Sequence, residues 1–86
     1  MQIWKFPIAH ERHQMVVMPR GAVLLDLQSQ KGVLTLWACV DPEKPKVQRD
    51  LSIIGTGHDL PGGKQAYIAT AQQGSLVWHL FDGGEV

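Results

Sequence analysis

The sequence predicts an all-β domain, built as a small sandwich or a partly open barrel of about seven short antiparallel strands. Three observations lead to this prediction. Short apolar runs recur along the 86 residues, and they are rich in β-branched and aromatic side chains. Proline, glycine or aspartate closes these runs, as turns between strands require. No segment keeps the period of an amphipathic helix, so helices are not expected as major elements.

The first strand is expected over residues 3–8, where Trp4, Phe6 and Ile8 fall on one face. Pro7 lies within this run and has no N–H group to donate to a neighbouring strand. We therefore expect this strand at the edge of a sheet, or to end at the proline. A second short strand is expected over residues 15–18.

A hairpin is predicted from two runs on either side of Gln30-Lys31-Gly32. The first run, residues 23–28, alternates in side-chain character. Its inward-facing residues are expected to be Val23, Leu25 and Leu27. The second run, residues 33–40, is apolar on both faces, which is typical of a central strand covered on both sides. A second layer or another subunit would supply that cover.

The remaining elements follow from turn residues. The polar stretch 41–49 contains two prolines and is predicted to be the longest loop. Further strands are expected over residues 51–54, 66–71 and 75–81, the last two as a closing hairpin. Residues 82–86 are expected to form a flexible acidic tail on a single domain that spans residues 1–86.

Composition favours self-association. Hydrophobic residues make up 44% and charged residues 19%, with a formal net charge of zero. A chain of this size buries only about 60% of its unfolded surface, so additional burial would help it. Cys39 is the only cysteine, which excludes an internal disulfide, and no Cys and His spacing suggests a zinc site. We expect a homo-oligomer, most simply a two-fold dimer.

Several classes of protein are disfavoured. The pI of 6.9 lacks the basic excess of a general nucleic-acid binder. No apolar run approaches the roughly 20 residues of a membrane helix. The N-terminal residues do not have the organisation of a signal peptide. These observations lead us to expect a soluble cytosolic protein, with Cys39 reduced and buried in its apolar strand.

One candidate ligand site is the segment Gly55, Thr56, Gly57 and His58. Successive glycines can expose backbone N–H groups that converge on an anion, and the threonine and histidine side chains could add contacts. The alternative is a tight turn or bulge in which Gly55 and Gly57 adopt positive φ. The segment lacks the full glycine spacing and following helix of a phosphate-binding fingerprint.

Three further residues complete the candidate ligand site: Trp4, Trp78 and His79. A tryptophan can stack on a flat ligand, although indoles more often pack in a core or interface. His79 alternates with apolar neighbours, so it either lies satisfied in a core or lines a pocket. No catalytic residue set and no metal-ligand spacing is present, so we expect neither enzymatic activity nor a cofactor or metal.

The chain also resembles a family of small phage and prophage proteins of unknown function. The matching strings are IWKF at 3–6, MPRGA at 18–22, LWACVDPE at 36–43, IIGTGHDLP at 53–61, YIAT at 67–70 and GSLVWHLF at 74–81. The resemblance covers nearly the whole chain. It implies a compact all-β fold, a viral or prophage accessory gene and a location in the bacterial host cytoplasm. It brings no catalytic residues to this sequence.

The sequence therefore supports three hypotheses of function. The first is a non-catalytic phage accessory protein that binds a bacterial host component, for example a host protein, stoichiometrically. An anti-defence role of the phage protein is one use of such binding. The second is sequestration of a small nucleotide-like ligand in an oligomer pocket. The third is a small metal-dependent hydrolase that uses His58, Asp59 and His79.

Overall fold

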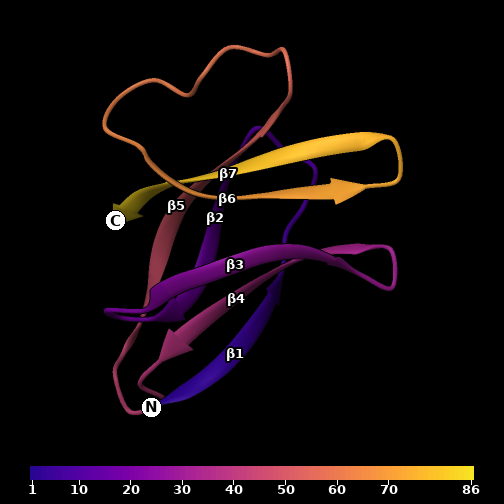
Figure 1. Cartoon of the computed structure of the whole chain (residues 1–86). Helices are drawn as coiled ribbons and strands as arrows, with labels where there is room; N and C mark the ends of the chain where they lie inside the picture. Colours follow the sequence, from indigo (N-terminus) through magenta and orange to yellow (C-terminus); the bar gives the residue numbers. More distant parts are fainter.

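The computed structural model describes residues 1–86 and confirms the predicted fold class. Seven antiparallel strands form two sheets that face each other as a sandwich, and there is no helix (Figure 1). The strands are β1 (Gln2–Pro7), β2 (His13–Pro19), β3 (Val23–Gln30), β4 (Val33–Val40), β5 (Lys46–Gly55), β6 (Ala66–Gln73) and β7 (Leu76–Glu85). The sheets do not close into a barrel. The structure contains no helix that could cross a membrane.

The two sheets have different sizes and connections. The three-stranded sheet has the order β1-β4-β3, and the four-stranded sheet has the order β2-β5-β7-β6. The edge position predicted for the first strand is confirmed, because β1 pairs with β4 alone. β4 is the centre of the three-stranded sheet, as its apolar character predicted. The hairpins β3–β4 and β6–β7 are both present.

The core lies between the sheets. β4 directs alternate residues inward, and Leu34, Leu36, Ala38 and Val40 are almost inaccessible to solvent. The four-stranded sheet meets them with Met18, Leu51, Ile53, Ala69, Ala71 and Leu80. Because each strand contributes side chains at every second position, short strands suffice to fill this layer.

A tight turn joins β3 to β4. Lys31 has φ of 50° and Gly32 has φ of 79°, and Gln30 pairs directly with Val33 across it. Two consecutive positive φ angles define the type I′ turn, whose twist matches that of the paired strands. The predicted hairpin loop is therefore confirmed at these residues.

The inward face predicted for β3 is wrong at two residues. Val23 is 57% and Leu25 46% exposed, whereas Leu24 packs against the core and Leu27 is buried. The ladder with β4 shifts between Leu24 and Asp26, so Leu25 is the extra residue of a β-bulge. A bulge reverses the alternation on one side of it, and Val23 consequently faces away from the core.

Two predicted loops are parts of strands. β5 begins at Lys46, so the loop after β4 covers residues 41–45 and is shorter than the predicted 41–49. Residues 82–85 are the end of β7, which pairs with the start of β5, so the predicted tail at 82–86 is wrong. The longest irregular segment is instead residues 56–65, between β5 and β6.

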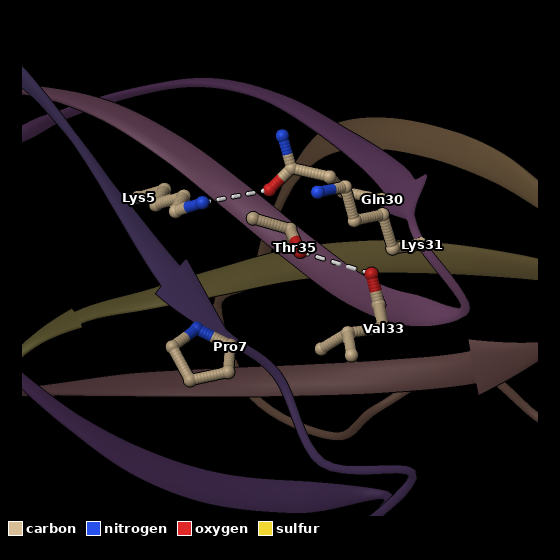
Figure 2. Close-up of a pocket in the computed structure, with 6 residues that line it drawn as sticks. All are labelled: Lys5, Pro7, Gln30, Lys31, Val33 and Thr35. Carbon is tan, nitrogen blue, oxygen red and sulfur yellow. Dashed lines mark hydrogen bonds between the residues drawn. The ribbon is translucent and has the colours of Figure 1, made fainter.

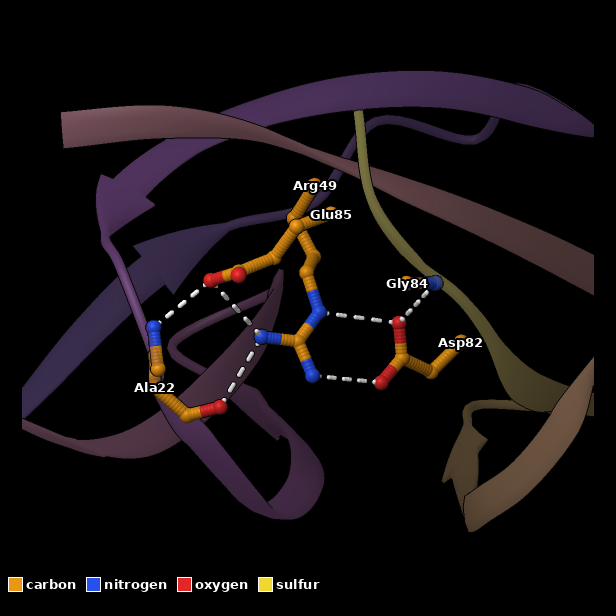
Figure 3. Close-up of polar contacts among 6 residues, drawn as sticks. Ala22, Arg49, Asp82, Gly84 and Glu85 are labelled. Carbon is orange, nitrogen blue, oxygen red and sulfur yellow. Dashed lines mark hydrogen bonds and ion pairs between the residues drawn. The ribbon is translucent and has the colours of Figure 1, made fainter.

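Arg49 explains why the end of β7 is ordered (Figure 3). Its guanidinium donates two hydrogen bonds to the Asp82 carboxylate, at 3.0 and 2.7 Å, and one to the carbonyl of Ala22 at 2.9 Å. Glu85 accepts a bond from the N–H of Gly21 and lies 3.8 Å from the guanidinium. We call Arg49, Asp82 and Glu85 the clasp, because they join β5, β7 and the β2–β3 turn.

The clasp shifts the pKa values of its charged groups. The hydrogen bond to Asp82 is the main cause that raises the pKa of Arg49, against the effect of burial. Burial by itself would raise the pKa of Asp82, but hydrogen bonds from Arg49 and from the N–H of Gly84, with the charge of Arg49, lower it. Both groups are therefore held in their charged forms.

The loop of residues 56–65 lies over the outer face of the four-stranded sheet. In Figure 1 it extends beyond β6 and β7, on the side away from the three-stranded sheet. The Arg12 guanidinium donates to the carbonyls of Asp59 and Leu60, at 2.7 and 3.2 Å. Ser52 and Ile54 point to this outer face and are only 3% and 2% exposed. The loop thus covers part of a face that is otherwise open to solvent.

Candidate ligand-binding site

The segment Gly55–His58 forms a tight turn at the end of β5. The N–H of His58 donates to the carbonyl of Gly55 at 3.1 Å, and Gly57 has φ of +92°. Positive φ at the third position of a four-residue turn is the geometry of a type II turn. Gly57 therefore meets the expectation of positive φ. Gly55 does not, because it is the last residue of β5.

The turn uses most of the N–H groups that an anion nest would need. The N–H of Thr56 donates to the carbonyl of Val77 at 3.3 Å, and that of His58 is engaged within the turn. The N–H of Gly57 has no backbone acceptor. The groups that this segment offers to a ligand are therefore mainly the side chains of Thr56 and His58.

A chain of hydrogen bonds runs from this turn across β7 and β6. The imidazole of His79 contacts the hydroxyl of Thr56 at 2.7 Å through Nε2 and that of Thr70 at 2.9 Å through Nδ1. Thr70 contacts the hydroxyl of Tyr67 at 2.6 Å. A neutral imidazole donates at one nitrogen and accepts at the other, and hydroxyls can serve either. His79 is half-buried on the outer face of the sheet. Each of its two ring nitrogens has a hydroxyl partner.

Trp78 and two histidine rings lie on the other side of the same turn. The rings of His10 and Trp78 have centroids 5.0 Å apart, and His10 contacts the amide oxygen of Gln73 at 2.7 Å. A Cβ atom built on Gly55 would lie 3.5 Å from the His58 ring and 3.7 Å from the Trp78 ring. Trp78 Nε1 is buried and has no hydrogen-bond acceptor. A buried N–H group without an acceptor lowers the stability of the folded protein unless a partner is supplied.

Two cavities meet at the turn. One has a volume of about 240 Å³, and Leu60, His79 and Phe81 line it together with the turn. The other has about 370 Å³, and Ser75, Leu76 and Trp78 form its far wall. We call the two cavities together the crevice. No lysine or arginine lines either cavity, so the crevice combines apolar surface with hydroxyl and imidazole groups and no fixed charge.

The crevice brings together every residue of the predicted site except Trp4. That residue lies in β1 of the three-stranded sheet, where it packs against the core. Its indole N–H donates to the side chain of Gln2 at 2.8 Å. Trp4 therefore does not line the crevice, and the structure does not bring it together with the other residues of the predicted site. Periodicity within a strand does not tell which sheet the strand will enter.

A second polar pocket was not foreseen from the sequence. The imidazole of His13 contacts the carboxylate of Asp50 on the outer face of β2 and β5. Together with Arg12, Ser52 and Gln65, these residues line a pocket of about 260 Å³. The side-chain oxygen of Gln65 is buried there without a partner. The alternation of Asp50 and Ser52 along β5 could have indicated a polar outer face, but β5 was predicted to begin after Asp50.

A shallow hollow of about 340 Å³ lies on the outer face of the three-stranded sheet (Figure 2). It lies between β1 and the β3–β4 turn, and Lys5 donates a hydrogen bond to Gln30 at 2.9 Å across its rim. Pro7 and Val33 supply its apolar walls. The hollow is wide and carries no convergent set of hydrogen-bonding groups, so the crevice remains the better candidate site.

Comparisons with known proteins locate the family but not the activity. The sequence profile of a domain of unknown function, DUF7352, matches residues 1–85. No curated protein and no solved structure matches the chain. No group of three or more histidine, cysteine, aspartate or glutamate side chains is arranged to hold a metal ion.

Proposed function

Because the chain belongs to the DUF7352 family, whose function is unknown, we propose a role from the site itself: non-catalytic, stoichiometric binding of a small host-cell molecule in the crevice. The molecule that fits best carries a flat heterocycle such as a nucleobase. In this proposal, the host component of the first hypothesis is the nucleotide-like ligand of the second, and it binds in the crevice.

The convergence of Thr56, His58 and Trp78 on one cavity carries this proposal. A half-exposed indole offers a stacking surface for a flat ring, and neighbouring hydroxyl and imidazole groups can read the polar edge of that ring. The unpartnered N–H of Trp78 adds a donor that a ligand or an enclosed water can use after a small shift. Sites of this kind need few polar groups when their positions are fixed.

The absence of lysine and arginine from the crevice indicates which part of the ligand it recognises. Phosphate recognition normally uses arginine, lysine or converging N–H groups. The crevice has no arginine or lysine, and the N–H groups of Thr56 and His58 in its turn already donate to backbone carbonyls. We therefore expect recognition through the base of a nucleotide-like molecule, with any phosphate directed toward solvent.

The cellular role follows from the resemblance to phage and prophage proteins. A small phage protein that sequesters a host nucleotide-like molecule would act by stoichiometry, in the cytoplasm of the infected bacterium. An anti-defence role is one such use. This part of the proposal rests on the resemblance and not on the geometry of the crevice.

The proposal can be tested by native mass spectrometry of the protein after incubation with a small-molecule extract of bacterial cells. We expect one ultraviolet-absorbing heterocycle per chain on the wild type and at least a 10-fold loss of occupancy for His58→Ala, about the effect of removing one good polar contact. His13→Ala is the matched control, because it removes an exposed histidine outside the crevice.

Two results would contradict the proposal. One is a ligand that His58→Ala retains as well as the wild type does. The other is the absence of any retained small molecule across extracts from uninfected and infected cells. Calorimetry with adenosine and AMP as probes adds a quantitative check, since base recognition predicts similar affinities for the two.

A further inference from the structure

The outer face of the three-stranded sheet is apolar where a sandwich normally presents polar residues. Ile3 on β1 is 64% exposed and Val23 on β3 is 57% exposed. Between them, Trp37 and Cys39 of β4 are half-buried and point away from the core. The outward residues of a sandwich alternate with core residues and are usually polar. A contiguous apolar patch of this kind marks an interaction surface.

The strand register arranges this face in rows. Cys39 pairs with Ile3 on one side and Val23 on the other, which makes an apolar row across three strands. Trp37 pairs with Lys5 on β1 and with Asp26 on β3, which makes the next row. The face therefore carries a cation on one flank of Trp37 and an anion on the other.

This charge pattern matches a second copy of the same face. A two-fold axis lying in the interface and parallel to β4 exchanges the two flanks, so Lys5 of each copy lies opposite Asp26 of the other. The same axis places Trp37 against its own copy and Ile3 against Val23. An in-plane axis perpendicular to β4 would instead oppose Lys5 to Lys5 and Asp26 to Asp26, which like-charge repulsion disfavours.

Contacts within the chain prepare Asp26 for this role. Its carboxylate accepts hydrogen bonds from the N–H of Leu27 at 2.9 Å and from the side chain of Gln28 at 2.8 Å. Neither partner is a cation, so the negative charge is fixed in place and is not neutralised within the chain. Lys5 likewise bonds a neutral amide, Gln30.

We propose that the protein forms a two-fold dimer through the outer face of the three-stranded sheet, with Trp37 at the centre and reciprocal Lys5–Asp26 pairs at the flanks. The occupant of this face is a second copy of the chain. The inference goes beyond the proposed function, because the crevice belongs to the other sheet and does not require it.

The size of the face sets the expected strength. The eight residues of β4 span about 26 Å and three strands about 15 Å, so the two copies together bury roughly 800 Å², an area typical of weak, transient complexes. We therefore expect a reversible dimer with a dissociation constant in the micromolar range. Sedimentation of the wild type should show the 9.5 kDa chain at low concentration and a species of twice that mass at high concentration.

Charge reversal identifies the face and the axis. Lys5→Glu and Asp26→Lys should each weaken dimerisation by about 10-fold or more, since each variant opposes two like charges in both flanks. The double variant with both substitutions restores opposite charges and should recover the wild-type dissociation constant. A far-ultraviolet spectrum equal to that of the wild type shows that each variant remains folded.

Cross-linking at the only cysteine provides a second measurement. Facing sheets lie about 10 Å apart, too far for a disulfide between Cys39 and its copy but within reach of a short bis-maleimide. We expect covalent dimers from the wild type and fewer from either single charge variant. A 9.5 kDa monomer at all concentrations would overturn the proposal and leave the face to another partner. A dimer that is indifferent to both reversals would overturn it too.

Discussion

The two ends of β5 and β7 hold polar groups of opposite character. At one end, the side chains of Arg49 and Asp82 are only 13% and 12% exposed, and each finds charged or backbone partners. At the other end, the crevice is half-open, carries no fixed charge and leaves the indole N–H of Trp78 without an acceptor. The difference indicates that the polar groups of the clasp are all engaged within the chain, whereas the crevice retains a polar group without a partner, as the proposed binding site requires.

Removing the cation of the clasp should have the largest effect. We expect Arg49→Leu to lower the free energy of unfolding by about 3–5 kcal/mol, because two carboxylates then lie close together without a cation. Urea denaturation measures the change, with Lys44→Ala as the control at an exposed cation. The pair Arg49→Met with Asp82→Leu should recover much of the loss. A loss within the range of ordinary surface substitutions would contradict a stabilising clasp.

Straining the turn at the crevice should have the next largest effect. Gly57→Val places a β-branched residue at φ of +92°, which we expect to lower the free energy of unfolding by about 1–3 kcal/mol. Gly55→Ala is the matched control, because its φ is not positive and its Cβ would lie at ordinary contact distance from the His58 and Trp78 rings. Equal melting temperatures for Gly57→Val and the wild type would show that the turn is not held in this conformation.

Acid should weaken the clasp. The pKa of Asp82 in the folded protein lies below its ordinary value of 3.8, so its contribution to stability is complete above that pH. It is lost as the pH falls below 3.8 through the folded-state pKa. Asp82→Asn should therefore show a shallower fall of the unfolding free energy over this window than the wild type does. Parallel slopes for the two proteins in acid would count against the charged clasp.

The smallest effect on stability is expected in the crevice, where binding should suffer most. His58 is exposed and its side chain makes no hydrogen bond within the chain, so His58→Ala should change the free energy of unfolding by less than about 0.5 kcal/mol. The same variant should lose ligand binding. Thermal denaturation measures the stability of this variant, and calorimetry on the same sample measures its ligand binding. A marked fall in the melting temperature of His58→Ala would show that His58 stabilises the fold, which contradicts its assignment to ligand binding alone.

The sequence predicted the fold class because local patterns carry it. Turn residues and alternation located all seven strands, and the Lys31-Gly32 pair located the β3–β4 turn. It could not locate the bulge at Leu25, since Val23, Leu24 and Leu25 are all apolar and give no sign of which one is the extra residue. Nor could it reveal that Asp82 continues β7, because its partner Arg49 lies far away along the chain.

The position of the candidate site was predictable in part, because local sequence patterns locate the ends of the strands that form it. Gly55–His58 and Trp78-His79 lie at the facing ends of β5 and β7, and strand pairing brings Gly55 opposite Trp78. The contact of His10 with Trp78 was missed, because it depends on how the β1–β2 connection crosses between the sheets. Trp4 was included by its residue type alone, and the topology places it in the other sheet.

The most direct test of the account is an NMR titration with adenosine that follows every backbone N–H group and the three indole N–H signals. We predict saturable shifts at the Trp78 indole, at residues 55–58 and at Ser75, with no change near Arg49 at the other end of β5. Shifts centred on the clasp, or a Trp78 signal that does not move while others do, would contradict the division between a stabilising end and a binding end.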